Sequence, residues 1–329
     1  MRIYHSGFVQ LILTSCFILL QVLYTGCNVK ENNQPIRVMS FNLWLGGDGC
    51  GMSRDSSTHF ELEAIRKAKA DMVGFQEQTD TSGRERAKLL ADSLGWNYYK
   101  ISESRAVVSR FPIEPIVVKA TQPANHHGSA GNNAQAVRVE LGNGKQLIFG
   151  VLHLMYTPYE PYDVADKKLK NAKDAEESAR RARLQEVQFM LESLESYLKE
   201  NIPVVLVGDF NEPSCLDWTE KAIRERSDTA LTFPVNWPSS RLLLDNGFID
   251  VFRTIYPDVN AQPAYTWTSR PGLWRNPEIH DRIDLIHATK KNIIPKNAWI
   301  VGESGVMSDI IVAPWPSDHR AVTAELIVN

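Results

Sequence analysis

Cysteine is scarce in this chain, with 4 among 329 residues, which is too few for a disulfide framework. Cys16 and Cys27 fall in or at the end of an N-terminal leader, so Cys50 and Cys215 could pair, although nothing in the sequence demands a bridge. The chain has no Cys/His pattern typical of zinc and no glycine-rich loop typical of a nucleoside triphosphate site. A strong positive charge is missing too, since the formal net charge is −3. That balance argues against a protein built around a long basic nucleic-acid groove.

The N-terminus has the layout of an export signal. Arg2 precedes an apolar stretch from Phe8 to Tyr24, and small residues follow just before Cys27. The stretch is short and interrupted by polar residues, which suits a signal peptide better than a membrane-spanning helix. Its Gly-Cys ending resembles a bacterial lipobox, although Tyr24 replaces the usual aliphatic residue. We expect a signal peptide over residues 1–26, a polar tether over 27–34, and an exported envelope lipoprotein carrying a lipid on Cys27. The alternative is a plain secreted protein with an incidental cysteine.

The rest of the chain has no internal repeat and no linker long enough to separate two domains. Apolar residues at helical spacing predict helices over residues 60–70, 84–94 and 172–200. The expected strands are Ile36–Phe41, Met72–Phe75, Arg105–Val108, Ala136–Leu141, Leu147–Leu154, Val204–Val207, Asp281–His287 and Ala321–Ile327. Their order predicts an α/β domain over residues 35–329, with mixed sheets covered by helices. Residues 232–240 and 266–278 are expected to be long ordered loops, which are often functional.

Polar residues recur where the predicted strands begin or end. The strand at 204–207 ends in Gly208-Asp209-Phe210-Asn211, and strand ends are where ligand sites form in α/β sheets. Other such residues are Asn42, Glu77, His153, Asp284, Asp318 and His319. Each could instead be a turn residue, a helix cap, a solvated acid or a core histidine. Their recurrence favours one shared site, which we expect at a solvent-facing rim.

The residue types suit metal and proton chemistry. Glu77, Asn42 and Asp318 offer hard oxygen ligands, the set that suits Mg²⁺ or Mn²⁺. The two histidines are donors in their charged form. The remaining carboxylates can orient a histidine or deprotonate a water.

An ordered series of short motifs resembles the endonuclease/exonuclease/phosphatase superfamily. The motifs span the chain after the tether and are Ser-Phe-Asn (40–42), Gly-Phe-Gln-Glu (74–77), Val-Val-Ser-Arg-Phe-Pro-Ile (107–113), Leu-His-Leu (152–154), Gly-Asp-Phe-Asn (208–211), Asp-Arg-Ile-Asp (281–284) and Ser-Asp-His (317–319). The resemblance implies a four-layer, DNase-I-like sandwich of two packed mixed β-sheets flanked by helices. It also implies hydrolysis of a phosphate ester with Mg²⁺ or Mn²⁺ as cofactor.

The resemblance also implies a role for each matched position. Glu77 would bind the metal, Asn42 would support it and Asp318 would assist. The catalytic set would be His153, Asp209, Asn211, Asp284 and His319. Within it, Asp209 would position or deprotonate the attacking water, Asn211 would hold a phosphoryl oxygen, and both histidines would donate to the phosphate, His319 being oriented by Asp284. These roles agree with phosphoryl transfer, which needs positioning and charge neutralisation.

The substrate is less sharply defined. The loop from Met155 to Asp163 holds three tyrosines and two prolines, so Tyr156 and Tyr162 could form a stiff substrate rim or could simply pack. Arg183 could reach a substrate phosphate or lie on a solvated helix face. Some repair nucleases of the family have an acid where this chain has Trp44, so repair-type activity is disfavoured. We expect a small, sugar-linked or lipid-linked phosphate as substrate.

Two other functions remain open at this point. One is a secreted DNase-like endonuclease, although long nucleic acid is disfavoured by the acidic chain. The other is a non-catalytic surface module that binds a glycan or a host protein, whose mark would be lost metal or base residues. We expect a monomer whose partners are the substrate and, through the lipid anchor, a membrane.

Overall fold

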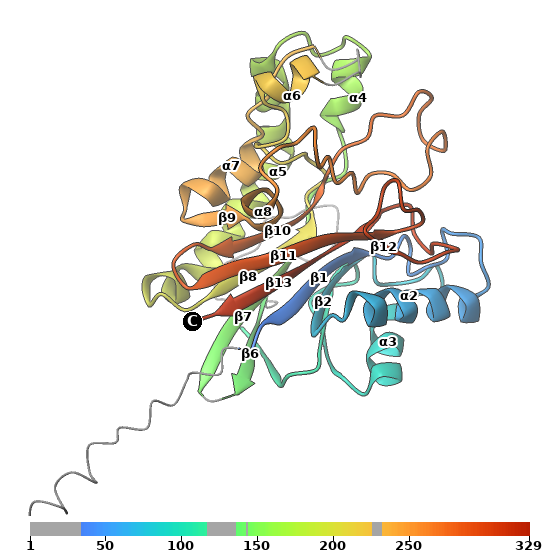
Figure 1. Ribbon diagram of the computed structural model, residues 1–329, viewed down its shortest axis with the longest axis vertical. Coiled ribbons are helices and arrows are strands. Elements are labelled where there is room, and N and C mark those ends of the chain that lie inside the picture. The colour runs from blue at the N-terminus through green and yellow to red at the C-terminus, as the bar shows by residue number, and fades with distance from the viewer. Residues whose placement is uncertain (1–33, 117–135, 143, 226–231) are drawn as a thin grey trace, which may run out of the picture. The chain divides into compact units, whose positions relative to one another are not determined.

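Two mixed β-sheets form the frame of the computed structural model (Figure 1). The structure describes residues 34–116, 136–142, 144–225 and 232–329. The expected signal peptide, Cys27 and nearly all of the tether therefore lie outside the described residues. By its contacts, the chain from Pro35 to Asn329 forms one unit. Among the described residues, no helix is long and apolar enough to span a membrane.

The first sheet has seven strands, in the order β12-β11-β13-β1-β2-β4-β3. Its strands are β1 (Ile36–Asn42), β2 (Met72–Gln76), β3 (Asn97–Lys100), β4 (Ala106–Ser109), β11 (Ile293–Gly302), β12 (Ile310–Ile311) and β13 (Ala321–Val328). β1 pairs in parallel with β2 and antiparallel with β13. The first and last long strands of the unit are therefore neighbours at its centre.

The second sheet has six strands, in the order β5-β6-β7-β8-β10-β9. Its strands are β5 (Ile113–Pro115), β6 (Ala136–Gly142), β7 (Lys145–His153), β8 (Val204–Asp209), β9 (Phe248–Asp250) and β10 (Asp284–Thr289). β7 and β8 run parallel, joined by a long helical crossover, and β10 runs antiparallel to β8. This pairing brings the ends of three strands, at His153, Asp209 and Asp284, to one edge.

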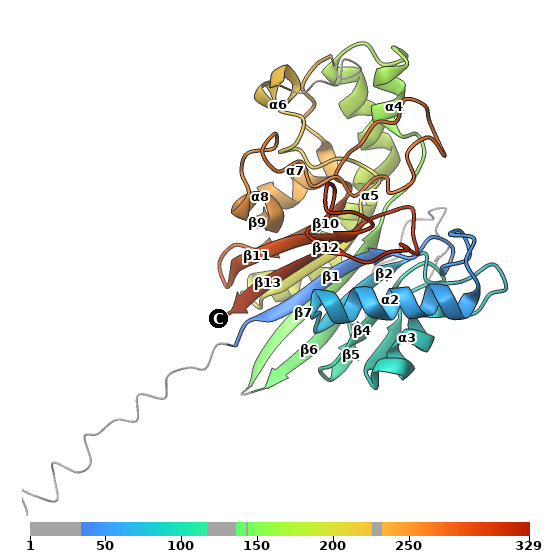
Figure 2. The ribbon, with the colours of Figure 1, turned by 45° about the vertical axis from the view of Figure 1, so that its right-hand side comes forward.

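Helices cover the outer face of each sheet, as Figure 2 shows for α2 and α3 beside β1 and β2. The helices are α2 (Arg54–Ala68), α3 (Arg86–Leu94), α4 (Glu160–Ala165), α5 (Ala172–Lys199), α6 (Glu220–Glu225), α7 (Pro238–Asp245) and α8 (Val251–Ile255). One core lies between the sheets, a second lies under α2 and α3, and a third lies under α5 and α7. This layering confirms the predicted four-layer sandwich.

Strand alternation decides which side chains enter the space between the sheets. Along β8, Val205 and Val207 belong to the inter-sheet core, whereas Val204 and Leu206 pack outward under α5. Because side chains alternate along a strand, Asp209 continues the inward row. The same alternation sends Asn42 inward from β1, His153 from β7 and Asp284 from β10. The inter-sheet core thus ends in a polar layer.

Several helix and strand boundaries differ from those predicted from the sequence. β10 begins at Asp284, and Asp281 makes only an isolated bridge to Trp267, so the expected strand over 281–287 starts three residues too early. α2 begins at Arg54 because Ser53 caps it by accepting a bond from the Ser56 backbone N–H. The expected loop over 232–240 ends in the first turn of α7, whose early proline suits a helix start.

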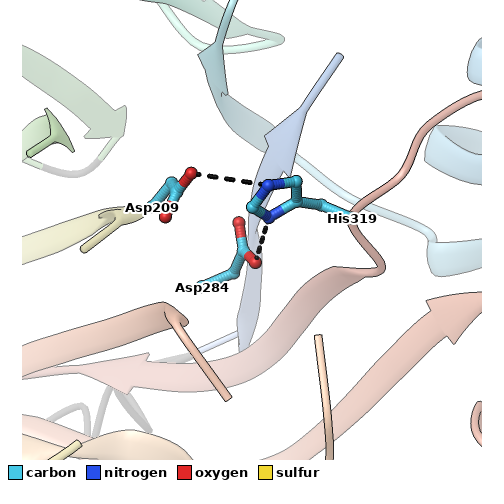
Figure 3. Close-up of side chains that lie close together, drawn as sticks. All are labelled: Asp209, Asp284 and His319. Carbon is cyan, nitrogen blue, oxygen red and sulfur yellow. Dashed lines mark hydrogen bonds and ion pairs between the residues drawn. The ribbon is translucent and has the colours of Figure 1, made fainter. Parts of the chain in front are cut away.

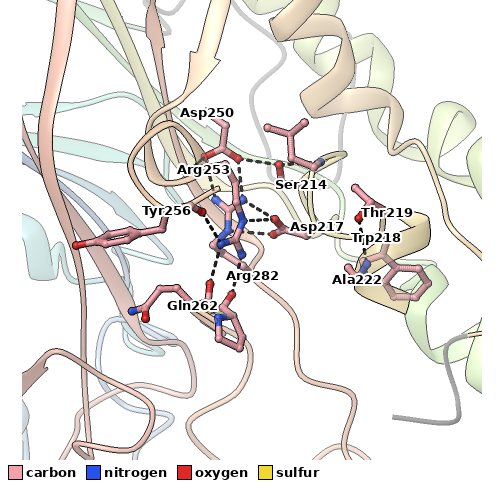
Figure 4. A network of polar contacts seen from close by, with 12 residues as sticks. Ser214, Asp217, Trp218, Thr219, Ala222, Asp250, Arg253, Tyr256, Gln262 and Arg282 are labelled. Atoms are coloured by element: carbon pink, nitrogen blue, oxygen red, sulfur yellow. Dashed lines mark hydrogen bonds and ion pairs between the residues drawn. The ribbon is translucent and has the colours of Figure 1, made fainter. Parts of the chain in front are cut away.

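A buried charge network holds the segment before β10 (Figure 4). Arg282 pairs with Asp217 at 3.0 Å and with Asp250 at 2.7 Å, and Arg253 also binds Asp217. Burial alone would raise the pKa of Asp250, but Arg282 holds it well below its usual range. Arg282 lies within the segment expected to be a strand, but it instead ties the chain to the start of α8, two residues before β10 begins. Cys50 and Cys215 are both free thiols.

Candidate active site

Asp209, Asp284 and His319 meet at the polar end of the inter-sheet core (Figure 3). Asp284 lies directly opposite Asp209 in the β8–β10 ladder, and His319 comes from the loop before β13. His319 Nδ1 lies 2.9 Å from Asp284 Oδ2, and its Nε2 lies 3.7 Å from Asp209 Oδ2. One carboxylate thus fixes the ring while the other ring nitrogen faces a second carboxylate.

Burial and charge set the protonation of this group. Asp209 is 1% exposed and His319 is 4% exposed, so the expected solvent-facing rim is a buried layer instead. Burial alone would lower the pKa of His319, but Asp284 and Asp209 raise it well above its usual value. Burial raises the pKa of Asp209, with Asp284 adding to the rise and His319 opposing it. Both carboxylates therefore favour the charged form of the His319 imidazole.

His153 approaches Asp209 from the other side. Its Nε2 lies 3.7 Å from Asp209 Oδ2, and its Nδ1 lies 2.6 Å from the Ser104 hydroxyl. The Glu77 backbone N–H lies 3.4 Å from that hydroxyl oxygen and donates to it. The Ser104 hydroxyl thus holds the His153 ring with its Nε2 toward Asp209. Ser104 was not predicted from the sequence, because its position between two strands carries no motif.

Glu77 and Asn42 lie together next to the group formed by Asp209, Asp284 and His319. The Asn42 amide donates to Glu77 Oε1 at 3.3 Å and to Asp209 Oδ2 at 3.1 Å. The Leu45 backbone N–H donates to Glu77 Oε2 at 2.8 Å. Glu77 has a positive φ of 51°, and Trp44 and Leu45 have positive φ as well. Such backbone conformations are costly for non-glycine residues and cluster at functional sites.

The oxygen-rich side of the site fits a hard divalent cation. Asp318 Oδ1 is buried and accepts no hydrogen bond from the described residues. Burial raises the pKa of Asp318 to about 6, His319 opposes the rise and Glu77 adds to it. A cation beside both carboxylates would satisfy the orphaned oxygen and remove their repulsion. Asp209, Asp284 and His319 also lie within 4.8 Å of one another, but a protonated imidazole has no lone pair for a metal.

Asn211 completes the cluster. Its backbone N–H donates to Asp209 Oδ1 at 2.8 Å, and its side-chain amide donates to the Leu154 carbonyl at 3.0 Å. Its φ of 47° is positive, as at Glu77. The structure therefore brings together Asn42, Glu77, His153, Asp209, Asn211, Asp284, Asp318 and His319.

Two of the three tyrosines in the loop from Met155 to Asp163, the tyrosine loop, pack against other side chains. The Trp267 indole donates to the Tyr162 hydroxyl at 2.9 Å, and Tyr162 in turn donates to Glu278. Tyr159 packs against Tyr162 and Trp267. Tyr156 stays exposed.

Arg183 does not fit the expected contact with a substrate phosphate. Its side chain is fully buried, so it does not lie on a solvated helix face either. Its guanidinium pairs with Glu160 and Glu212 and donates to the backbone carbonyls of Met155 and Pro158. The physical reason is that a buried guanidinium must be neutralised and fully bonded. Arg183 thus ties α5 to the loop that follows His153.

The chain belongs to the Endonuclease/Exonuclease/phosphatase family, whose model matches residues 39–319. It is 28% identical over 325 residues to the uncharacterized protein F14F9.5 of Caenorhabditis elegans, covering 94% of this chain and 97% of that protein. The structure is similar to truncated TDP2 of the same nematode, with a TM-score of 0.54, 14% identity and coverage of 89% and 98%. It is also similar to an AP endonuclease from Archaeoglobus fulgidus, with a TM-score of 0.50, 17% identity and coverage of 88% and 98%.

These likenesses to solved structures concern the fold, since the identities are low. They agree with the two packed mixed sheets and flanking helices described above. The family itself is one of hydrolytic phosphoesterases, so nuclease or phosphoesterase chemistry is the class in which the site is best understood.

Proposed function

We propose that this chain hydrolyses a phosphodiester or phosphomonoester by metal-assisted, in-line attack of water. The observation that carries the proposal is the juxtaposition of a proton-transfer group, Asp284–His319–Asp209, with an oxygen-rich cradle at Glu77 and Asp318. A non-catalytic binding module would have no use for a buried, protonated histidine held between two carboxylates. The proposal therefore favours an enzyme over the surface-module alternative.

Different residues of the chain accept a proton, donate a proton and bind the phosphoryl group. Asp209, the buried carboxylate with a raised pKa, accepts the proton of the attacking water. His319, held protonated by Asp284, donates to the phosphoryl group as charge develops. His153, oriented by Ser104, donates from its Nε2 on the other side, and the Asn211 amide binds a phosphoryl oxygen.

Glu77, Asp318 and Asn42 would hold a divalent metal, and Mg²⁺ or Mn²⁺ suits their oxygen atoms. The ion would supply positive charge to neutralise the phosphoryl oxygens. Asn42 links the cradle to the proton-transfer group, because its amide bonds to both Glu77 and Asp209.

For the substrate we propose a small, sugar-linked or lipid-linked phosphate, acted on by a monomer. A nuclease that follows a duplex needs cations to replace released counterions. The segment from Asp163 to Glu177 carries four lysines against five acids and offers no such track. A secreted endonuclease remains the second candidate, since the AP endonuclease above shares the fold.

A panel of phosphate esters tests this proposal. Purified protein with Mg²⁺ should cleave small mono- or diesters faster than plasmid DNA, and Asp209→Asn should cleave neither. Rapid plasmid degradation that added salt slows sharply would favour the endonuclease instead. Hydrolysis that survives in Asp209→Asn would identify a contaminant or refute the assigned base.

A further inference from the structure

Trp274, in the loop over residues 266–278, is exposed yet held in place. It is 53% exposed, although tryptophan is the side chain with most to gain from burial. Its ring stacks on Trp267, with the ring centroids 6.3 Å apart, and makes an edge contact with Trp44 at 6.5 Å. An apolar ring fixed on several sides and open to solvent is preorganised to receive a ligand.

Other exposed side chains extend this surface. Leu273, next to Trp274, is 54% exposed, and Leu45, next to Trp44, is 46% exposed. The two segments meet through the contact between Trp44 and Trp274. The Arg270 guanidinium lies over the Trp44 ring at 5.8 Å. We call Trp274, Leu45, Leu273 and Arg270 the tryptophan platform.

The platform begins at the reacting centre. The Trp267 ring lies 4.9 Å from the His319 ring, and Trp274 stacks on that same tryptophan. The backbone N–H of Leu45 donates to Glu77, and the side chain of Trp274 helps to lower the pKa of Asp318. A group esterified to a phosphate in the site would therefore meet the platform first.

We propose that the tryptophan platform binds a flat ring in the organic part of the phosphate ester. This inference rests on the proposed function and names the substrate class for the same site. Tyr162, one of the two tyrosines expected to form a substrate rim, cannot supply this contact, because it is engaged with Tyr159, Trp267 and Glu278.

A flat ring fits this surface better than an alkyl chain does. A ring laid on an indole gains stacking in addition to burial, and such stacking on an aromatic side chain amounts to about a fivefold to hundredfold gain in affinity. An alkyl chain gains only the burial of area. The platform presents a rigid exposed indole in contact with Trp44, and the planar Arg270 guanidinium lies over the Trp44 ring. This arrangement favours a planar ligand.

The test compares three phosphonates that cannot be hydrolysed: phenylphosphonate, cyclohexylphosphonate and methylphosphonate. They carry the same charge, and the first two are similar in size but only phenylphosphonate is flat. Binding is followed by the protein's tryptophan fluorescence with Mg²⁺ present. We expect phenylphosphonate to bind at least about fivefold more tightly than cyclohexylphosphonate. Trp274→Leu, which keeps an apolar side chain, should abolish that difference, and Trp274→Phe, which keeps a ring, should retain most of it.

Tyr156→Ala is the matched control, because it removes an exposed aromatic side chain of the tyrosine loop. It should leave the preference for the flat ring unchanged. Equal binding of the phenyl and cyclohexyl probes by the wild type would overturn the proposal, because it would indicate an apolar site that does not distinguish a flat ring from a non-planar one. Unchanged preference in Trp274→Leu would overturn it as well. If the proposed hydrolysis fails instead, no ester will be cleaved while the ring preference in binding persists.

Discussion

At the scale of single residues, the site combines groups whose charges oppose or support one another within a few ångströms. His319 keeps its proton because two carboxylates outweigh its burial. Asp209 is pushed toward the neutral form by burial and by Asp284. Neighbouring titratable groups with strongly perturbed pKa values are a common sign of an acid and a base with assigned roles.

Asp209→Asn and His319→Ala test those roles separately. Each should lower turnover about a hundredfold or more, the size expected for one lost acid, base or charge-stabilising group. Because both residues are buried, stability must be measured alongside by denaturant unfolding. A folded variant with normal turnover would show that the role is wrongly assigned at that position.

Ser104→Ala tests the orientation of His153. Without the hydroxyl, Nδ1 of His153 loses its 2.6 Å partner, so the ring can rotate away from Asp209. We expect kcat to fall about tenfold, less than for loss of a proton donor itself, while KM changes little. Ser104→Thr keeps the hydroxyl and should restore most of the rate. A Thr variant as slow as the Ala variant would contradict an orienting role.

At the scale of elements, the apolar runs of the strands carried most of the prediction. The polar residues near the ends of the runs that form β1, β7 and β8 were readable from the sequence, and they include Asn42, His153 and Asp209. The first residues of the Asp-Arg-Ile-Asp motif misled, because a buried charge network resembles an alternating strand in sequence. The surroundings of Arg183 were also predicted wrongly, because its carboxylate partners lie 23 and 29 residues away along the chain.

The network around Arg282 should be structural. Arg282→Met leaves Asp250 buried without its cationic partner and Asp217 paired with Arg253 alone, so the free energy of unfolding should fall by about 3–5 kcal/mol. Lys88→Met is the control, since it breaks an exposed ion pair with Asp92 on α3 and should cost about 0.5 kcal/mol or less. Urea unfolding of both variants gives the comparison. Equal losses would mean that the buried network contributes no more than a surface pair.

At the scale of the whole molecule, the sequence predicted the layers and the family but not the surface around the site. Motif order spans the chain, so residues 40 to 319 could be assigned to one fold. The contact of Trp274 with Trp44 joins two segments that are distant in the sequence, and neither tryptophan belongs to a motif. The packing of loop side chains around the site therefore supplies the information about the substrate that the sequence did not.

Export and anchoring also belong to this scale, and we propose both from the N-terminal sequence. If Cys27 is lipidated, the wild-type protein should fractionate with membranes. Cys27→Ser should then become soluble or accumulate as the precursor. Identical soluble fractionation of the two proteins would favour plain secretion.

The dependence of hydrolysis on a divalent metal tests the central claim most directly. Glu77 is the anionic ligand that the oxygen-rich cradle requires, and Glu77→Gln keeps its shape while removing its charge. EDTA should abolish hydrolysis by the wild type, and Mg²⁺ or Mn²⁺ should restore it. Glu77→Gln should lose most of the activity at every Mg²⁺ concentration. Full activity of the wild type in EDTA would contradict the account.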